Sequence, residues 1–377
     1  MTSTAPDHRP VWAEIDLAAV RANVRVLRAL VAPAEVCAVV KAHGYGHGSI
    51  PVGRAAVEAG AAWLAVALVE EGVHLRDAAI DAPILVLSEP VPGAAETVIA
   101  NRLTPVVYTP DGIDALAKVA AAMSAEPIAV HLKIDTGMHR VGCSPRNAVD
   151  LAAHVCDRPE LRLAGVCTHF AVADEPDNPF NEEQRTAFER ILSELRARGL
   201  PTGIVHAANT AAAIASPAAR YDMVRAGIGV YGIAPAPALG REVALVPALA
   251  VKARVSHVQT LGAGERISYG LRYATTERTT IATVPIGYAD GVPRELAHRG
   301  GEVLIHARRF PIAGTVTMDQ LMVDVGAEPV AIGDDVVLLG TQGAETITAQ
   351  DWADKMDTIA YTIVCGIGPR VPRNYLS

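Results

Sequence analysis

The sequence predicts an α/β protein in which an N-terminal (β/α)8 TIM-like barrel is followed by a mainly β C-terminal domain. Two observations support this fold class. Over about the first 240 residues, eight short apolar runs rich in β-branched residues alternate with segments of helical periodicity. After that point, short β-branched runs are joined by Gly and Pro turns, and helical patterns become few. A doubly wound parallel sheet is the alternative that the alternation leaves open.

The expected barrel begins after an amphipathic helix. Asp16 precedes the stretch LAAVRANVRVLRALV, whose apolar residues recur at helical spacing, so we expect Asp16 to cap this helix. The eight expected strands are residues 36–40, 63–68, 83–87, 103–108, 128–134, 163–168, 203–207 and 223–230. The clearest helix between them covers residues 181–199 and ends on a glycine.

A domain boundary is predicted at residues 233–240, where the segment IAPAPALG has no periodicity. We therefore expect a first domain at residues 1–240 and a second at residues 241–377. In the second domain, the expected strands include residues 248–258, 279–284 and 334–339.

Composition excludes several classes of partner. The net charge is −8 with acids and bases interspersed, so neither nucleic acid nor an anionic membrane is an expected partner. The longest apolar stretch, residues 59–69, is too short to span a bilayer, and MTSTAPDHRP at the N-terminus is not a hydrophobic signal segment. We expect a cytoplasmic protein. Its five cysteines lack CxxC spacing, which indicates reduced thiols and no metal site.

The stretch AVVKAHGYGHGS at residues 38–49 contains a candidate reactive amine. Lys41 ends a buried, β-branched run, and the next eight residues include three glycines, two histidines and a tyrosine. A lysine at a strand end is usually a solvated surface residue. At a buried strand edge, however, it can lose its charge, and a neutral amine forms a Schiff base with an aldehyde cofactor.

Polar residues follow the last four expected barrel strands. The fifth strand leads into LKIDTGMHRVG, the sixth into CTHFAVAD, the seventh into HAANTAA and the eighth into VRAGIGVYG. Because a barrel keeps its active site where the strands end, these segments are expected to meet the residues that follow Lys41. On their own, a histidine or an arginine at these positions would be a core or surface residue.

These segments, together with RISYGLRY, PIGYADGVPR, GTVTMDQ and IAYTIVCGIGPRVPRNY from the second domain, resemble bacterial alanine racemases, which are fold-type III pyridoxal-phosphate enzymes. The resemblance extends from about residue 11 to residue 375. It implies that Lys41 holds pyridoxal 5'-phosphate as a Schiff base. The other residues that the resemblance places against the cofactor are Tyr45, His169, Asn209, Thr210, Arg225, Gly227, Ile228 and Tyr361.

The resemblance gives Arg225 a particular role, facing the pyridine nitrogen of the cofactor. A guanidinium donates a hydrogen bond there but does not protonate the ring, which weakens the electron sink and favours racemisation over transamination. His169 would lie between the cofactor and Arg225, and the neighbouring positive charge would keep it neutral.

Two bases are implied, since racemisation removes a proton from one face of the α-carbon and returns one to the other. Tyr269 would act on L-alanine and Lys41 on D-alanine. Tyr269 would act on the neighbouring subunit, so a homodimer with shared active sites is expected. By resemblance, the substrate side consists of Arg140, Tyr288, Met318 and Asp319, with Lys133 as a possible carbamylated lysine that orients Arg140. Asp135 is the alternative, structural partner for Lys133.

The chain departs from the family pattern at His43 and in Gly-Ile-Gly-Pro at residues 366–369, and the effects of His43 and Thr317 stay open. The expected activity is interconversion of L- and D-alanine, which supplies D-alanine for peptidoglycan precursors. Two alternatives remain open. One is a racemase of another amino acid such as serine, and the other is a non-catalytic pyridoxal-phosphate carrier, a class that usually lacks the second domain.

Overall fold

The computed structural model describes residues 8–377, so part of the N-terminal segment in which no signal sequence is expected, residues 1–7, lies outside the described residues. Two compact units make up the chain. Among the described residues, one contains residues 18–44 and 49–247, and the other contains residues 8–17, 45–48 and 248–377. We call the first the barrel unit and the second the β unit. The predicted division at residue 240 stays a prediction.

The barrel unit contains eight parallel strands, which confirms the predicted fold class. The sheet order is β8-β7-β6-β5-β4-β3-β2-β9. Its edge strands β8 and β9 are joined by backbone hydrogen bonds from Asp222 N to Val205 O and from Arg225 N to Ala208 O, so the barrel is nearly closed. The strands are β2 (Glu35–Val39), β3 (Trp63–Val66), β4 (Ile84–Val86), β5 (Thr104–Val107), β6 (Ile128–Lys133), β7 (Leu161–Cys167), β8 (Ile204–His206) and β9 (Met223–Ala226).

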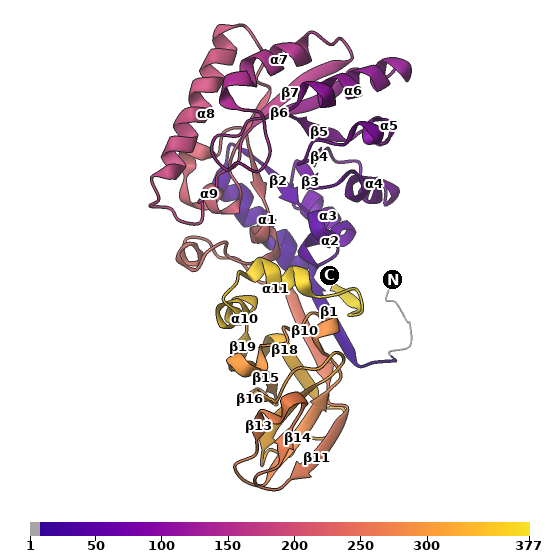
Figure 1. Cartoon of the computed structure of the whole chain (residues 1–377), viewed down its shortest axis with the longest axis vertical. Coiled ribbons are helices and arrows are strands. Elements are labelled where there is room, and N and C mark those ends of the chain that lie inside the picture. Colours follow the sequence, from indigo (N-terminus) through magenta and orange to yellow (C-terminus); the bar gives the residue numbers. More distant parts are fainter. Residues whose placement is uncertain (1–7) are drawn as a thin grey trace. The chain divides into compact units, whose positions relative to one another are not determined.

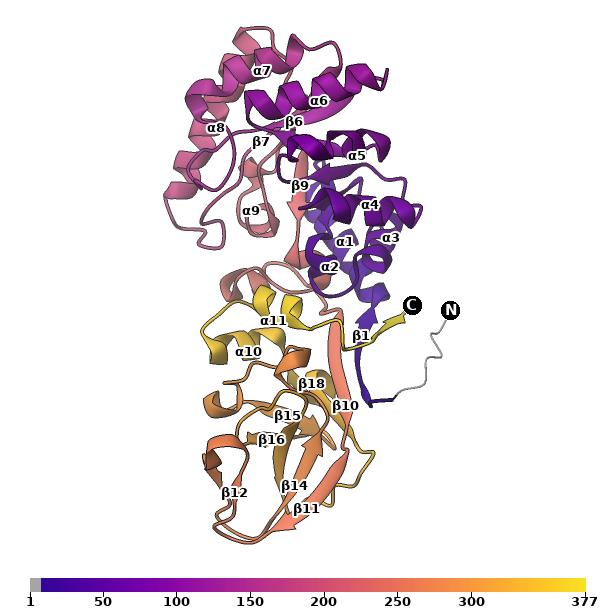
Figure 2. The same cartoon turned by 45° about the vertical axis from the view of Figure 1, so that its right-hand side comes forward.

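Helices surround this sheet, and α3 to α7 follow one another around its outside (Figure 2). Helix α6 begins at an ordinary start signal, where Thr109 accepts a hydrogen bond from Gly112 N and Pro110 is the first residue. The helices are α1 (Leu17–Val31), α3 (Ser49–Glu58), α4 (Val69–Asp77), α5 (Ala95–Ala100), α6 (Pro110–Ala122), α7 (Ala148–Cys156), α8 (Phe180–Ala197) and α9 (Thr210–Ala215).

Each predicted barrel strand is present, but the last one is shorter than predicted. β9 ends at Ala226, and a 3₁₀ helix occupies Ile228–Tyr231. The expectation that the strand continues to residue 230 was wrong. Gly227 and Gly229 donate their N–H groups to the hydroxyl of Thr210, and this turns the chain away from the strand. The predicted helix at residues 181–199 is confirmed as α8, which ends two residues before Gly199.

The β unit consists mainly of one large sheet, in which the strands pair antiparallel except for the parallel pair of β1 with β20 (Figure 1). Its strand order is β11-β14-β17-β16-β15-β18-β10-β1-β20, with β19 paired to β18, while β12 and β13 form a separate pair. Helices α10 (Ala349–Met356) and α11 (Ala360–Gly366) pack on each other. The strands are β1 (Val11–Asp16), β10 (Leu249–Arg254), β11 (His257–Leu261), β12 (Arg266–Ile267), β13 (Tyr273–Ala274), β14 (Thr279–Val284), β15 (Glu302–Ile305), β16 (Arg308–Ala313), β17 (Leu321–Gly326), β18 (Asp335–Gln342), β19 (Glu345–Ile347) and β20 (Arg373–Leu376).

Two features of this sheet differ from the sequence analysis. The expected strand at residues 248–258 is divided into β10 and β11, because β10 pairs with β1 and β18 whereas β11 pairs with β14. Strand β1 was missed altogether. Its side chains alternate between buried Val11, Ala13 and Ile15 and less buried neighbours, and this period of two was the available signal.

None of the helices in residues 8–377 combines the length and the apolar character needed to cross a bilayer. No disulfide joins the five cysteines, all of which lie within residues 8–377, and Cys37, Cys143 and Cys167 are buried.

Asn23 fastens α1 to the segment that follows β9. Its side chain is fully buried, Nδ2 donates to Val230 O (3.3 Å) and Val246 O (2.9 Å), and Oδ1 accepts from Val246 N (2.8 Å). A buried backbone group that loses its partner costs the desolvation of that group.

We therefore expect Asn23→Ala to lower the free energy of unfolding of the barrel unit by about 2–4 kcal/mol. The urea midpoint followed by far-UV circular dichroism measures this loss. Arg25→Ala is the control, since Arg25 lies exposed on the same helix and should change the midpoint little. Equal midpoints for the two variants would contradict the role given to Asn23.

Candidate active site

Cationic side chains gather at the carboxyl ends of the barrel strands. Lys41 comes directly after β2 and Val40, Lys133 is the last residue of β6, and Arg225 is in β9. Arg140 follows β6 and His169 follows β7. Burial holds the pKa of His169 well below its usual value, and the positive charges of Arg225, Lys133, Arg140 and Lys41 lower it further. The barrel fold thus brings five of the predicted site residues to one end.

Arg225 is buried and its guanidinium is fixed by donated hydrogen bonds. Nη2 donates to Thr168 O (2.7 Å), Ala207 O (2.8 Å) and His169 Nδ1 (3.1 Å). Nη1 donates to His206 Nδ1 (2.6 Å). Because a guanidinium has only donors, both imidazole Nδ1 atoms must be acceptors. His169 and His206 therefore have their proton on Nε2.

The hydrogen bonds continue from His206 to a third histidine, His131. His206 Nε2 lies 2.8 Å from His131 Nδ1, so His206 donates and His131 is protonated on its own Nε2. Burial and the charge of Arg225 lower the pKa of His131 to about 4 and that of His206 well below its usual value. Both rings are consequently neutral at physiological pH.

Sequence reasoning missed His131 and His206. The barrel provides space for them by a β-bulge at His131 and by Gly165 on the next strand, where an added Cβ would lie 2.7 Å from the His131 ring. Among residues 8–377, His131 Nε2 is a buried atom without a hydrogen-bond partner, and the Trp63 ring centroid lies 5.7 Å from that of His131. The available signal was a glycine inside an apolar strand beside polar residues in neighbouring strands.

Thr210 organises the segment after β9. Its Oγ1 accepts from Gly227 N (2.9 Å) and Gly229 N (3.4 Å), which leaves its O–H to donate elsewhere. A side chain at Gly229 would place Cβ 2.7 Å from Thr210 Cγ2, so glycine is required for this approach. Asn209 caps α9 by accepting from Ala212 N (2.9 Å). Its amide therefore has a structural task at this position.

The turn after Lys41 is left-handed. Ala42, His43 and Tyr45 have φ values of 52°, 55° and 50°, and Gly44 has 60°. Each such non-glycine residue costs roughly 1–2 kcal/mol relative to ordinary backbone. Histidine is among the residues enriched in this region, which gives a structural account of the unusual His43. Strain of this size is maintained only where surrounding contacts fix the backbone.

Lys133 is buried, with 8% of its surface exposed, and its pKa is lowered to about 8. Burial is the largest cause, and the charges of Arg225, Arg140 and Lys41 act in the same direction. Asp135, the alternative partner, instead accepts from Gly137 N and His139 N, both at 3.0 Å. Within the described residues Lys133 forms no ion pair with Asp135, so the structural alternative is not supported.

The other predicted site residues belong to the β unit. Tyr45 is buried with its ring centroid 6.0 Å from that of Tyr361. Burial raises the pKa of the Tyr45 phenol, and Tyr361 and Cys365 add to the increase, so Tyr45 remains a protonated hydrogen-bond donor. In the Gly-Ile-Gly-Pro segment at residues 366–369, which departs from the family pattern, Ile367 O and Gly368 O accept hydrogen bonds from Arg373.

Tyr269, Tyr288 and Met318 lie on neighbouring segments of the β unit, and all three side chains are exposed, Tyr269 by 71%. Tyr269 O accepts from Thr315 Oγ1, and Tyr288 N donates to Thr317 O. Thr317 itself closes a turn with Gln320, since its hydroxyl donates to Gln320 O and accepts from Gln320 N. Thr317 therefore has a local structural role.

Asp319 is part of an ion-pair network in the β unit. Its Oδ1 accepts from Arg370 Nη2 (2.7 Å), and Arg370 Nε also lies 3.5 Å from Asp290 Oδ1. Asp290 is fully buried and receives two hydrogen bonds from Arg9. The charge of Asp319 is thus compensated by a neighbouring arginine.

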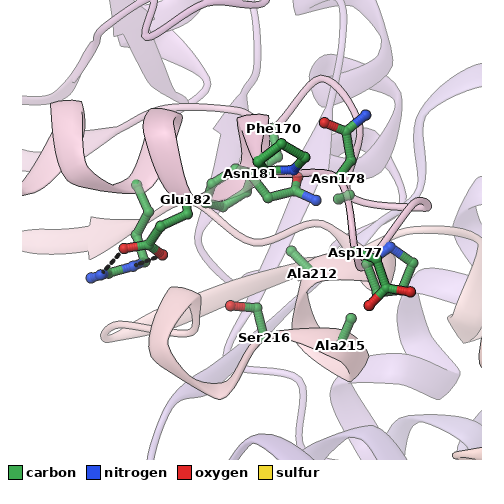
Figure 3. A pocket seen from close by; sticks show the side chains of 12 residues that line it. Phe170, Asp177, Asn178, Asn181, Glu182, Ala212, Ala215 and Ser216 are labelled. Atoms are coloured by element: carbon green, nitrogen blue, oxygen red, sulfur yellow. Dashed lines mark hydrogen bonds and ion pairs between the residues drawn. The ribbon is translucent and has the colours of Figure 1, made fainter.

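A cavity of about 240 Å³ lies between α9 and the start of α8 (Figure 3). Its lining includes Phe170, Asn181 and Ser216, and the ion pair of Glu182 with Arg185 (2.6 Å) is on one side. None of the predicted site residues lines this cavity. Among residues 8–377, no cluster of His, Cys, Asp or Glu has the arrangement of a metal site.

The fold and the site together define a barrel enzyme with an amine at the end of one strand and a buried, donor-only arginine on its neighbour. Family models described as "Alanine racemase, N-terminal domain" and "Alanine racemase, C-terminal domain" match residues 15–235 and 248–375. The chain belongs to the alanine racemase family, which confirms the resemblance seen in the sequence.

Individual relatives agree over nearly the whole length. The alanine racemase of Symbiobacterium thermophilum is 50% identical over 368 residues, 97% of each chain. The crystal structure of alanine racemase from D-cycloserine producing Streptomyces lavendulae has a TM-score of 0.94 and 41% identity, covering 98% of this chain and 97% of that one. The alanine racemase from Bartonella henselae, with covalently bound pyridoxal phosphate, has a TM-score of 0.87 and 28% identity, covering 97% of this chain and 99% of that one.

The hydrogen-bond directions around Arg225 predict how two histidines titrate. In ¹⁵N NMR spectra, the ring signals of His131 and His206 should keep the pattern of a neutral, Nε2-protonated imidazole between about pH 5.5 and 9, because the pKa of each is lowered. Single His→Phe variants assign the signals. In urea-unfolded protein the same rings should titrate near their ordinary pKa of about 6.5. Titration of either ring above pH 5.5 in the folded protein would overturn this assignment.

Proposed function

We propose that this protein is an isomerase that interconverts L-alanine and D-alanine with pyridoxal 5'-phosphate. The observation that supports the proposal most directly is Arg225, a buried guanidinium whose partners are carbonyl oxygens and neutral imidazoles. The covalently bound pyridoxal phosphate of the Bartonella henselae relative supports the choice of cofactor. When bound, the cofactor supplies an aldehyde for a lysine amine and an electron-withdrawing ring that stabilises negative charge at the α-carbon.

The residues present fit this cofactor. A phosphate needs hydrogen-bond donors, and we assign this role to the Thr210 hydroxyl and the Ile228 N–H, beside a cation-rich barrel end. The Gly227 N–H, which donates to Thr210 Oγ1, would be shared between Thr210 and the phosphate. The protonated phenol of Tyr45 and the hydroxyl of Tyr361 are further donors in this proposal. Asn209 acts by capping the helix that begins with Thr210.

Arg225 determines the type of reaction in this proposal. It donates to the ring nitrogen but does not release its own proton, because the pKa of arginine is far above neutrality even when burial lowers it. The cofactor ring therefore withdraws less negative charge from the α-carbon of the substrate than a protonated ring would. His169 remains neutral beside Arg225, so it accepts a hydrogen bond from Arg225 and can donate one from Nε2.

Lys41 and Tyr269 are the two proposed bases. Lys41 Nζ removes the α-proton of D-alanine, and the Tyr269 hydroxyl, after losing its proton, removes that of L-alanine. When L-alanine is converted to D-alanine, Lys41 delivers the new proton to the α-carbon. When D-alanine is converted to L-alanine, Tyr269 delivers it. The 71% exposure of Tyr269 is consistent with a side chain that another subunit covers.

The remaining assignments concern substrate and assembly. Arg140 would approach the substrate carboxylate, Lys133 would orient Arg140 as a carbamate, and Tyr288, Met318 and Asp319 would line the substrate path. In this proposal the protein is a cytoplasmic homodimer in which residues 1–240 bind the cofactor. Residues 241–377 then supply Tyr269 to the partner subunit, and the product D-alanine serves peptidoglycan precursors.

Borohydride reduction of the purified holoenzyme tests the central assignment. Reduction should remove the visible absorption of the bound cofactor and leave the pyridoxyl group on Lys41 in the peptide map. A chiral assay should show L-alanine converted to D-alanine, and Lys41→Ala should lower this rate by about 10²–10⁴-fold or more. The same assay with L-serine tests substrate choice. A labelled Lys41 without turnover would favour the carrier alternative, and no label at Lys41 would overturn the proposal.

The proposed carbamate on Lys133 is tested by ¹³C NMR in ¹³C-bicarbonate. Only an unprotonated amine reacts with CO₂, and the pKa of Lys133 is lowered to about 8, so a carbamate signal should be present at pH 8–9. It should weaken as the pH falls below 8, where the ammonium form dominates. Lys133→Gln is the matched control and should lack the signal. A spectrum that is the same in both proteins would show that Lys133 is unmodified.

A further inference from the structure

We propose that Glu71 is a positioning residue for Lys41, because its carboxylate holds the left-handed turn that follows this lysine. The inference rests on the proposed role of Lys41 as the cofactor-binding amine and base. Glu71 lies in the first turn of α4, thirty residues further along the chain, and none of the roles assigned above involves it.

The carboxylate of Glu71 joins two loops at the barrel end. Oε1 accepts a short hydrogen bond from Ala42 N (2.6 Å), the residue immediately after Lys41. Oε2 accepts from Ala67 N (2.8 Å) and Leu68 N (3.1 Å), in the loop after β3. Hydrogen bonds to an ionised carboxylate are stronger than those between neutral groups. The loops after two adjacent strands are therefore fixed to one anion.

The hydrogen bond to Ala42 N lies at the start of a strained, left-handed backbone segment. Ala42 is the first of five consecutive residues with positive φ, and Gly44 N closes the turn by donating to Val40 O (2.9 Å). At Gly44 an added Cβ would lie 3.0 Å from Ser49 N. The Ala42 side chain is exposed, so packing of its methyl group does not stabilise the left-handed conformation. The hydrogen bond from Ala42 N to Glu71 Oε1 is a direct polar contact that holds the backbone of this residue.

Helix capping alone does not account for this geometry. A glutamate at the third position of a helix ordinarily accepts from the N-cap N–H, which is the task of Oε2 at Leu68. The bond from Oε1 to Ala42 N crosses to a different loop and has no part in the cap. The bond from Leu68 N to Oε2 stabilises the start of α4, whereas the bond from Ala42 N to Oε1 stabilises the turn beside Lys41.

Loss of the contact should displace Lys41 and not only weaken the fold. If Ala42 relaxes towards ordinary φ, the chain direction after Lys41 changes and Nζ moves relative to the groups around it. Positions of reacting groups matter on the scale of an ångström. We therefore expect slower proton transfer by Lys41 and easier loss of the covalently bound cofactor.

Four variants of the holoenzyme distinguish positioning of Lys41 by Glu71 from simple capping of α4. Glu71→Ala removes the carboxylate, and Glu71→Gln keeps its shape but leaves one oxygen to accept. Glu70→Gln is the matched control, one residue away in the same helical turn and exposed. The double variant Glu71→Ala with Ala42→Gly tests the mechanism, because glycine adopts positive φ without strain. Thermal unfolding of each holoenzyme shows whether the variants fold.

Three readouts go beyond overall activity. Release of cofactor to hydroxylamine, followed by visible absorbance, should become about tenfold faster in Glu71→Ala, as expected for loss of a charge-assisted hydrogen bond. The primary isotope effect with α-deuterated D-alanine should increase and that with α-deuterated L-alanine should decrease. This split arises because Lys41 removes the proton from the D-enantiomer. The two enantiomers have equal free energies, so kcat/KM alone cannot reveal such a split.

The outcomes are distinct. Faster release and the isotope split in Glu71→Ala, a smaller effect in Glu71→Gln, wild-type behaviour in Glu70→Gln and substantial recovery with Ala42→Gly support the inference. A lower unfolding temperature with wild-type release and isotope effects, or no recovery with Ala42→Gly, would overturn it in favour of a simple helix cap. Failure of the wild-type protein to retain borohydride label on Lys41 would instead overturn the proposed function.

Discussion

The buried guanidinium of Arg225 is the constraint on which the rest of the barrel end depends. A positive charge inside the barrel must be compensated by hydrogen-bond acceptors. The fold meets this need with the carbonyl oxygens of Thr168 and Ala207 and with two imidazoles. Because arginine only donates, the tautomers of both histidines are fixed, and burial keeps them neutral. One side chain thereby determines the protonation of the groups around it.

Both proposed bases lie beside strained backbone. Ala42, directly after Lys41, has a φ of 52°, and Tyr269 lies between Ser268 and Leu271, whose φ values are 64° and 49°. Left-handed non-glycine residues concentrate at functional sites, where the surrounding structure over-determines them. For Lys41 the surroundings include Glu71 and the tight approach of Gly44 to Ser49. Left-handed non-glycine backbone therefore occurs beside each of the two proposed bases.

Local sequence patterns explain how far prediction succeeded. The barrel strands are short and buried, so their apolar β-branched runs were recognisable, and glycine ended α8 where expected. The pattern misled at residues 227–230, where apolar residues between glycines form a 3₁₀ helix bound to Thr210. It also overlooked β1, because a strand of six residues whose partners are β10 and β20 gives a weak local signal.

The sequence by itself determined the fold class, the family and the identity of the candidate side chains, because apolar periodicity and short motifs are local properties of the chain. It could not supply the two histidines beneath Arg225 or the bond from Glu71 to Ala42. His131 and His206 are 75 residues apart, and Glu71 and Ala42 are 29 apart. Only the order in which the strands pair in the folded barrel decides which strand ends become neighbours. The protonation states and the support of the strained turn follow from that pairing, since both depend on atoms that meet only in three dimensions.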